Sequence, residues 1–197
     1  MVSQRILVSC ADFSTTSGFI TCLEFDGRKF KLLNEVKIPH PNPKIAVQGK
    51  GITGMCYGIG GTVWAAFSNM IARIRIDDGT IIETIHDDKF NDLHDLHIKD
   101  DNLIAVNSGN ESIDFIDIQS GKIERFDLLG DSLRAKTREV TANSDTKPHL
   151  HHVSSITYNA QNEMLLAFFK QQRIINIDNW GQIGHRMPSP MHDLQFR

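Results

Sequence analysis

Four segments of this chain share one pattern: a short run rich in β-forming residues, then a turn that ends in glycine. The final runs of the four segments are FITCLEFDG, IARIRIDDG, IDFIDIQSG and RIINIDNWG, which end at Gly27, Gly79, Gly121 and Gly181. Within 71–76 the side chains alternate with a period of two, which is the period of a β-strand and not of a helix. The glycines suit tight reversals of direction. The pattern therefore predicts repeated antiparallel hairpins.

A further strand precedes three of these hairpins and recurs near the end of the chain. Its copies are ITGMCY at 52–57, LHDLHI at 93–98, HHVSSI at 151–156 and MHDLQF at 191–196. The offsets are 93 − 52 = 41 and 192 − 152 = 40 residues. A period near 40 with several short strands per repeat is typical of propeller blades.

We therefore predict an all-β protein, a β-propeller of about four blades that forms a single domain over 1–197. A sandwich of β-hairpins is the alternative. The predicted blade-like repeats cover about 6–48, 49–90, 91–147 and 148–190, with an extra strand at 191–196.

The first and last strands of the pattern complement each other. The first repeat begins on its second strand, whereas 191–196 is a first strand without the rest of a blade. Pairing of 191–196 with the N-terminal blade would close a ring of four blades and cover exposed strand edges. Alternatively, the chain is part of a larger propeller, or a second copy completes the ring as a homo-oligomer.

Two runs, LIAVNSGNESIDFIDIQSGKI and EMLLAFFKQQRIINIDNWGQI, each follow a histidine-containing strand, HDLHI or HHVSSI. These runs resemble the bacterial six- and seven-bladed propellers of the NHL and YncE type, and the HDL pattern is similar to uncharacterised bacterial propellers. No Trp-Asp dipeptide ends a blade, which argues against the WD40 subgroup. The resemblance covers nearly the whole chain and implies the fold without choosing an activity.

Histidine recurs at one position of the predicted inner strands, as His94, His152 and His192, and Asp95 and Asp193 adjoin two of them. Inner strands line the central channel of a propeller, so these five residues are the predicted ligand-binding set. The three imidazoles could hold a divalent metal such as zinc, iron or manganese. Alternatively, the histidines form structural hydrogen bonds. The second repeat has Ile52 at the equivalent position, which leaves any ring incomplete.

Other features are weaker candidates. His97 and His151 are expected on the opposite faces of their strands from the aligned histidines. The insertion 131–149 carries a mild excess of positive charge, so it is either a loop that covers an anionic ligand or a disordered surface loop.

Composition narrows the class of partner. The formal net charge is −3, which does not favour binding to nucleic acid or to a membrane. The chain has 3 cysteines without C-x-x-C spacing, which fits a reducing, cytoplasmic location.

These features together predict a propeller that binds a small-molecule or protein ligand at one face. A metal-assisted lyase or hydrolase with its His/Asp site at the central channel is one form of this hypothesis. The alternative is a protein-interaction scaffold without catalytic activity, in which the histidines are structural.

Overall fold

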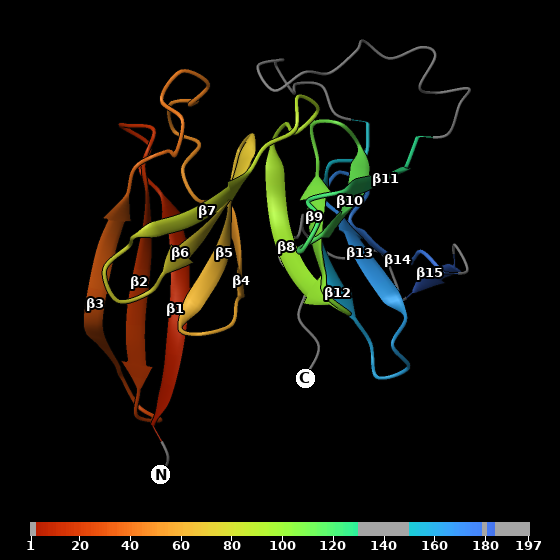
Figure 1. Cartoon of the computed structure of the whole chain (residues 1–197). Coiled ribbons are helices and arrows are strands. Elements are labelled where there is room, and N and C mark those ends of the chain that lie inside the picture. The colour runs from red at the N-terminus through yellow and green to blue at the C-terminus, as the bar shows by residue number, and fades with distance from the viewer. Residues whose placement is uncertain (1–2, 130–149, 179–180, 184–197) are drawn as a thin grey trace. The chain divides into compact units, whose positions relative to one another are not determined.

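The computed structural model describes residues 3–129, 150–178 and 181–183. Within this part the chain consists of strands, turns and loops, and it divides into two compact units, 1–86 and 87–197 (Figure 1). No helix in the described ranges has the length and apolar character needed to cross a bilayer.

The first unit contains two antiparallel sheets. The first sheet has the order β1-β2-β3, and the second has the order β4-β5-β6-β7 (Figure 1). The strands are β1 (Gln4–Ala11), β2 (Gly18–Phe25), β3 (Phe30–Ile38), β4 (Gly54–Tyr57), β5 (Thr62–Phe67), β6 (Met70–Arg75) and β7 (Ile81–Ile85).

The second unit also contains two antiparallel sheets, β8-β9-β10-β11 and β12-β13-β14-β15. The strands are β8 (Leu93–Lys99), β9 (Asn102–Asn107), β10 (Ser112–Asp117), β11 (Ile123–Asp127), β12 (Val153–Tyr158), β13 (Met164–Phe168), β14 (Arg173–Asn176) and β15 (Gly181–Ile183).

Each sheet is a meander in which every strand pairs with its neighbours in sequence. This is the arrangement of propeller blades, and the all-β prediction is confirmed. The first sheet has three strands and the other three sheets have four. The strand predicted at 191–196 lies outside the described residues. Ring closure, the alternative larger ring and the single domain stay predictions.

Each unit has an apolar core that both of its sheets share. In the first unit Ile20 and Ile38 of one sheet pack with Val63, Phe67 and Ile74 of the other. The second unit has a matching core, formed by side chains of both sheets: Ile104, Val106, Ile113, Leu128, Val153, Ile156, Met164, Leu166 and Phe168. Neither sheet of a pair can bury this face alone, so the two depend on each other for stability.

A side chain at the end of the second strand of each four-stranded sheet, or in the turn that follows, holds the segment that enters that sheet. Asn107 is the last residue of β9, whereas Asn69 and Gln171 lie in the turns after β5 and β13. In each case a side-chain amide donates a hydrogen bond to a carbonyl oxygen of the entering segment. The bonds are Asn69 Nδ2 to Ile45 O (2.6 Å), Asn107 Nδ2 to Lys89 O (2.9 Å) and Gln171 Nε2 to Leu150 O (3.0 Å). The entry into each inner strand is thus fixed by its own blade.

In the first unit, His40 makes a further hydrogen bond to Asn69, the residue that holds the entering segment. Its ring is 3% exposed, and its Nδ1 accepts the Asn42 N–H at 3.0 Å. Nε2 therefore carries the proton and donates to Asn69 Oδ1 at 3.0 Å. Burial lowers the pKa of His40, which favours this neutral form.

Gly79 and Gly121 occupy equivalent turns with φ values of 72° and 70°. A β-carbon at Gly79 would overlap Val36 Cγ1 and lie 2.7 Å from Ile38 Cδ1, whereas one at Gly121 would meet no atom within 4 Å. Gly79→Ala should therefore destabilise the protein by about 1 to 3 kcal/mol more than Gly121→Ala, because only the former overpacks. Urea unfolding of both variants measures the difference, and equal losses would contradict this packing.

Acidification should weaken the first unit through His40. Because its folded pKa is depressed, its contribution to stability is complete above the unfolded pKa of about 6.5 and is lost as pH falls toward the folded value. The free energy of unfolding of the wild type should thus fall more steeply below about pH 6.5 than that of His40→Gln. The exposed His86 provides the control, and His86→Gln should keep the wild-type slope. Parallel curves for wild type and His40→Gln would disprove the assignment.

Candidate functional site

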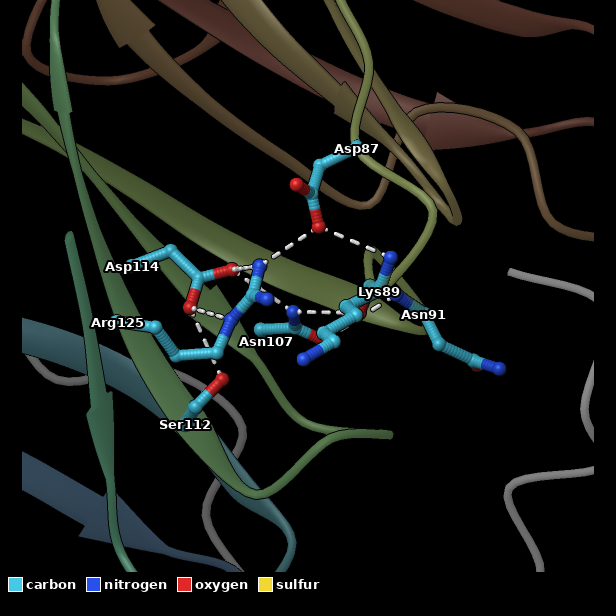
Figure 2. Close-up of polar contacts among 7 residues, drawn as sticks. All are labelled: Asp87, Lys89, Asn91, Asn107, Ser112, Asp114 and Arg125. Carbon is cyan, nitrogen blue, oxygen red and sulfur yellow. Dashed lines mark hydrogen bonds and ion pairs between the residues drawn. The ribbon is translucent and has the colours of Figure 1, made fainter. Parts of the chain in front are cut away.

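A buried ion pair joins β10 and β11 of the β8-β9-β10-β11 sheet (Figure 2). Asp114 on β10 is fully buried and stands opposite Arg125 on β11 in the strand register. Arg125 Nε donates to Oδ1 at 2.7 Å and Nη2 to Oδ2 at 2.8 Å, which is a bidentate pair. Ser112 Oγ and Asn107 Nδ2 donate to the same carboxylate at 3.0 and 2.8 Å. The carboxylate is therefore well satisfied despite its burial.

This network also holds the segment that leads into β8 (Figure 2). Arg125 Nη2 donates to Asp87 Oδ1 at 3.0 Å, and Asp87 Oδ1 accepts the Lys89 N–H at 2.9 Å. The side chain of Asn107 contacts the same segment, since its Oδ1 accepts the Asn91 N–H at 3.2 Å. Burial lowers the pKa of Arg125, but Asp114 and Asp87 outweigh this and raise it. The network fixes the start of the inner strand.

The inner strands β8 and β12 both begin irregularly. Asp92 and His152, the residues just before them, have positive φ values of 51° and 52°. A shift of register, typical of a β-bulge, follows in each strand, between Leu93 and Asp95 and between Val153 and Ser155. The structural equivalent of His152 is thus Asp92, and the sequence alignment of His152 with His94 is displaced by two residues.

His94 and His152 nevertheless meet. Their ring centroids are 4.8 Å apart with an interplanar angle of 61°, an edge-to-face arrangement. His94 Nε2 lies 3.6 Å from Asp92 Oδ2, and the His152 ring contacts Phe169 on its other side at 5.1 Å. The His94 side chain is 17% exposed, but Nε2 of His94 and Nε2 of His152 are both shielded from solvent. We call these three residues, Asp92, His94 and His152, the histidine site.

Asp95, also a predicted ligand residue, braces two sheets. Its Oδ2 accepts Ser155 Oγ at 2.9 Å and the Ile156 N–H at 3.0 Å, both from β12. Its Oδ1 accepts the Leu96 N–H at 2.8 Å. The Asp95 carboxylate therefore ties β8 to β12. Ser108 Oγ adds a second tie through the carbonyl oxygen of Val153.

The remaining predicted features are placed as follows. His192, Asp193 and the 131–149 insertion lie outside the described residues. Within the described ranges no group of three or more His, Cys, Asp or Glu side chains is arranged to hold a metal ion.

His97 and His151 contact other partners. The His97 ring lies 5.0 Å from the ring of Tyr158, over which Lys99 Nζ also lies at 3.9 Å. Burial is the main cause that raises the pKa of Tyr158 to about 12. His151 lies against Glu111, with its Nδ1 3.5 Å from Glu111 Oε2.

No protein-family model matches the chain. No curated protein matches it either.

Solved structures do match, at low sequence identity. A streptogramin B lyase has a TM-score of 0.56 and 13% identity, with 95% of this chain covering 74% of the lyase. A catalytically inactive His-to-Ala variant of virginiamycin B lyase from Staphylococcus aureus, solved with quinupristin, has a TM-score of 0.56 and 13% identity. The match covers 96% of this chain and 76% of the variant. The WD40 β-propeller domain of Doa1 has a TM-score of 0.51 and 12% identity, and the match covers 90% of this chain and 53% of that domain.

Likeness at these identities concerns the fold. The chain has a β-propeller fold, and it spans about three quarters of the two lyases and about half of the WD40 domain. The narrower resemblance to NHL and YncE propellers stays a prediction.

Removal of Arg125 should be far more damaging than removal of an exposed arginine. Arg125→Met leaves the carboxylate of Asp114 buried without its counter-charge, which should cost about 3 to 5 kcal/mol. Arg75 pairs with Asp78 at the surface at 3.0 Å, so Arg75→Met should cost less than about 1 kcal/mol. Chemical unfolding of both variants gives the comparison. A loss below about 1 kcal/mol for Arg125→Met would show that the buried pair does not stabilise the sheet.

Proposed function

We propose that this chain is a ligand-binding β-propeller whose site includes His94 and His152. The observation that carries the proposal is the contact between the two imidazoles, which come from the starts of two different inner strands. Imidazole exchanges protons near neutral pH, donates and accepts hydrogen bonds and coordinates metals. Two of them in contact beside a buried carboxylate, with the His94 side chain 17% exposed, would form a polar recognition point.

The fold supports the choice of this location. Propellers place the starts of their inner strands around a central channel, and equivalent side chains of successive blades converge there. In this chain Asp92 and His152 are the equivalent residues, and His94 adds the second imidazole. The buried network around Asp114 holds the segment before Asp92 and thereby limits the freedom of the site.

We further propose lyase or hydrolase chemistry at the histidine site. Two similar solved structures are described as streptogramin B and virginiamycin B lyases, and a His-to-Ala variant of the latter is described as catalytically inactive. In the present chain the imidazoles of His94 and His152 are the groups that would move protons on a bound ligand.

A metal-assisted form of this proposal requires a third protein ligand. His94 and His152 would supply two ring nitrogens, and the sequence offers His192 as the third. A bound zinc, iron or manganese ion would lower the pKa of a water molecule or polarise a carbonyl group.

The second candidate function is a protein-interaction scaffold. Phe13 and Ile59, both in loops of the first unit, are 83% and 80% exposed, and a partner protein would cover such apolar side chains. The use of Asp95 as a brace between β8 and β12 also fits a structural role for this motif.

Ligand binding separates these functions. A thermal-shift screen of small organic acids, sugars and cyclic peptides, with quinupristin among them, identifies a ligand for titration by calorimetry. His94→Ala and His152→Ala should each weaken binding about tenfold, as expected for loss of one hydrogen bond of about 1.5 kcal/mol. The exposed His86, outside the site, provides the matched control, and His86→Ala should bind as the wild type does.

Unchanged affinity in both site variants would refute the proposed site. Capture of a protein partner that is lost when Phe13 or Ile59 is changed to Ser, but kept in His152→Ala, would favour the scaffold.

Elemental analysis of the purified protein tests the metal-assisted form. Stoichiometric metal that is lost in His152→Ala supports it, and ligand binding by a protein without metal contradicts it.

A further inference from the structure

The strand β1 (Gln4–Ala11) has a partner strand on one side. It pairs with β2 over all 8 of its residues, and the order β1-β2-β3 places it at the edge of its sheet (Figure 1). In the other three sheets the corresponding strands, β5, β9 and β13, have a further strand on that side. Among the described strands, none pairs with the open edge of β1.

The hydrogen-bonding pattern identifies the backbone groups at this edge. In an antiparallel pair, residues that bond to the partner strand alternate with residues whose N–H and C=O groups point the other way. The Asp12 N–H donates to Ser17 O at 3.0 Å and continues the register of β1 with β2, so the even-numbered residues of β1 bond to β2. The groups that point to the open edge are those of the odd-numbered residues, Arg5, Leu7, Ser9 and Ala11.

The sequence of β1 does not protect this edge. Exposed edge strands usually carry lysine, proline or a β-bulge, which prevents them from pairing with another strand. The strand QRILVSCA has one charged residue, Arg5, and no proline, and its register with β2 is continuous. The edge is therefore a long, regular and mostly apolar template for a further strand.

The first sheet also lacks the contact by which the other sheets hold an inner strand. In those sheets a side-chain amide, at the end of the second strand or in the next turn, bonds to the entering segment. The turn after β1, 12–17, contains no Asn or Gln. Its Asp12 carboxylate is bonded within the turn and to Lys37 Nζ at 2.9 Å. This difference favours an occupant other than the inner strand predicted at 191–196.

We propose that the open edge of β1 pairs with β1 of a second copy of this chain around a two-fold axis. Identical antiparallel strands are self-complementary around such an axis. With the axis at Val8, Arg5 and Leu7 lie opposite Ala11 and Ser9 of the second copy. Every backbone group that points to the edge then gains a partner. The two three-stranded sheets become one continuous sheet across a homodimer.

The side chains of β1 suit this register. Leu7 packs on the core of the first unit, so Ile6, Val8 and Cys10 share the opposite face of the sheet. In the dimer Val8 lies opposite Val8 of the second copy, and Ile6 lies opposite Cys10. Arg5 lies opposite an alanine, so the register opposes no like charges. Apolar contacts thus continue across the axis.

A charge at the axis tests the pairing. Val8 lies outside the core and is 37% exposed, so Val8→Lys should fold normally. It sets two lysines opposite each other, which should raise the dimer dissociation constant about tenfold or more. Leu32→Lys is the matched control, because Leu32 shares this face but lies on β3. Leu32→Lys should dimerise as the wild type does in sedimentation equilibrium. An equimolar mixture of Val8→Lys and Val8→Glu should restore the dimer.

A disulfide tests the register. Val8 and its symmetry mate form a pair without mutual hydrogen bonds, whose α-carbons are about 4.5 Å apart, within the range of a disulfide. In a Cys10→Ser background, Val8→Cys should therefore give a cross-linked dimer on mild oxidation, whereas Leu32→Cys should not. Non-reducing electrophoresis measures the product. Cys22 and Cys56 are present in both variants and are less exposed than Cys10.

The wild-type protein decides between the occupants of the edge. A dimer in which the amides of Arg5, Leu7, Ser9 and Ala11 exchange slowly with deuterium supports the proposal. A monomer at about 1 mM, the weak end of specific association, would overturn it. Slow exchange of these amides in such a monomer would show that the chain's own residues cover the edge. A dimer that Val8→Lys leaves intact would place the interface elsewhere and would also overturn the proposal.

Discussion

The buried carboxylate of Asp114 sets the requirements for its surroundings in the second unit. A charge without solvent contact must be paired and hydrogen-bonded, and here the cross-strand Arg125 provides both oxygens with a donor. The same guanidinium reaches Asp87, and the amide of Asn107 bridges the carboxylate to the Lys89 carbonyl. Through these bonds the sheet interior determines the path of the segment that becomes β8. The position of His94 depends on that path.

A buried ion pair is a poor source of net stability, since desolvation offsets much of the attraction between its charges. Here the ion pair instead fixes the position of the segment that enters β8. An apolar pair at these two positions would fill the space between the strands, but it would not hold the entering segment at Asp87. The equivalent device of the first unit is neutral, with His40 and Asn69 as partners. Both units thus hold the segment before an inner strand with a side-chain amide, Asn69 or Asn107, whose other partners differ.

The repeated sequence predicted the hairpins and the turns at Gly27, Gly79 and Gly121, because these depend on local alternation and on backbone conformations that favour glycine. Gly181, the fourth predicted turn glycine, begins β15. The repeated sequence aligned His94 with His152, but the structural equivalent of His152 is Asp92. The bulges in β8 and β12 lie at equivalent positions, between Leu93 and Asp95 and between Val153 and Ser155, and they fix this equivalence. The sequence alignment matched the histidines by residue type and could not detect the bulges. The sequence gives only a weak indication of the Asp114 network. An acidic residue alternates with apolar side chains in SIDFID, and an arginine follows in the next strand. Only the strand register shows that the two residues are opposite each other.

Three carboxylates near the starts of β8 and β12 have different roles, and geometry separates them. Asp95 accepts bonds from Ser155, Ile156 and Leu96, so its lone pairs are committed to joining two sheets. Glu111 accepts the backbone N–H of His151 with Oε1, and its Oε2 lies 3.5 Å from Nδ1 of the same residue. Asp92 lies beside an imidazole that itself contacts a second imidazole. A carboxylate that bonds to backbone and hydroxyl groups locks the fold. Asp92 and Glu111 instead lie 3.6 and 3.5 Å from an imidazole nitrogen, that of His94 in β8 and that of His151 just before β12. A carboxylate at this distance favours a positive charge on the ring beside it.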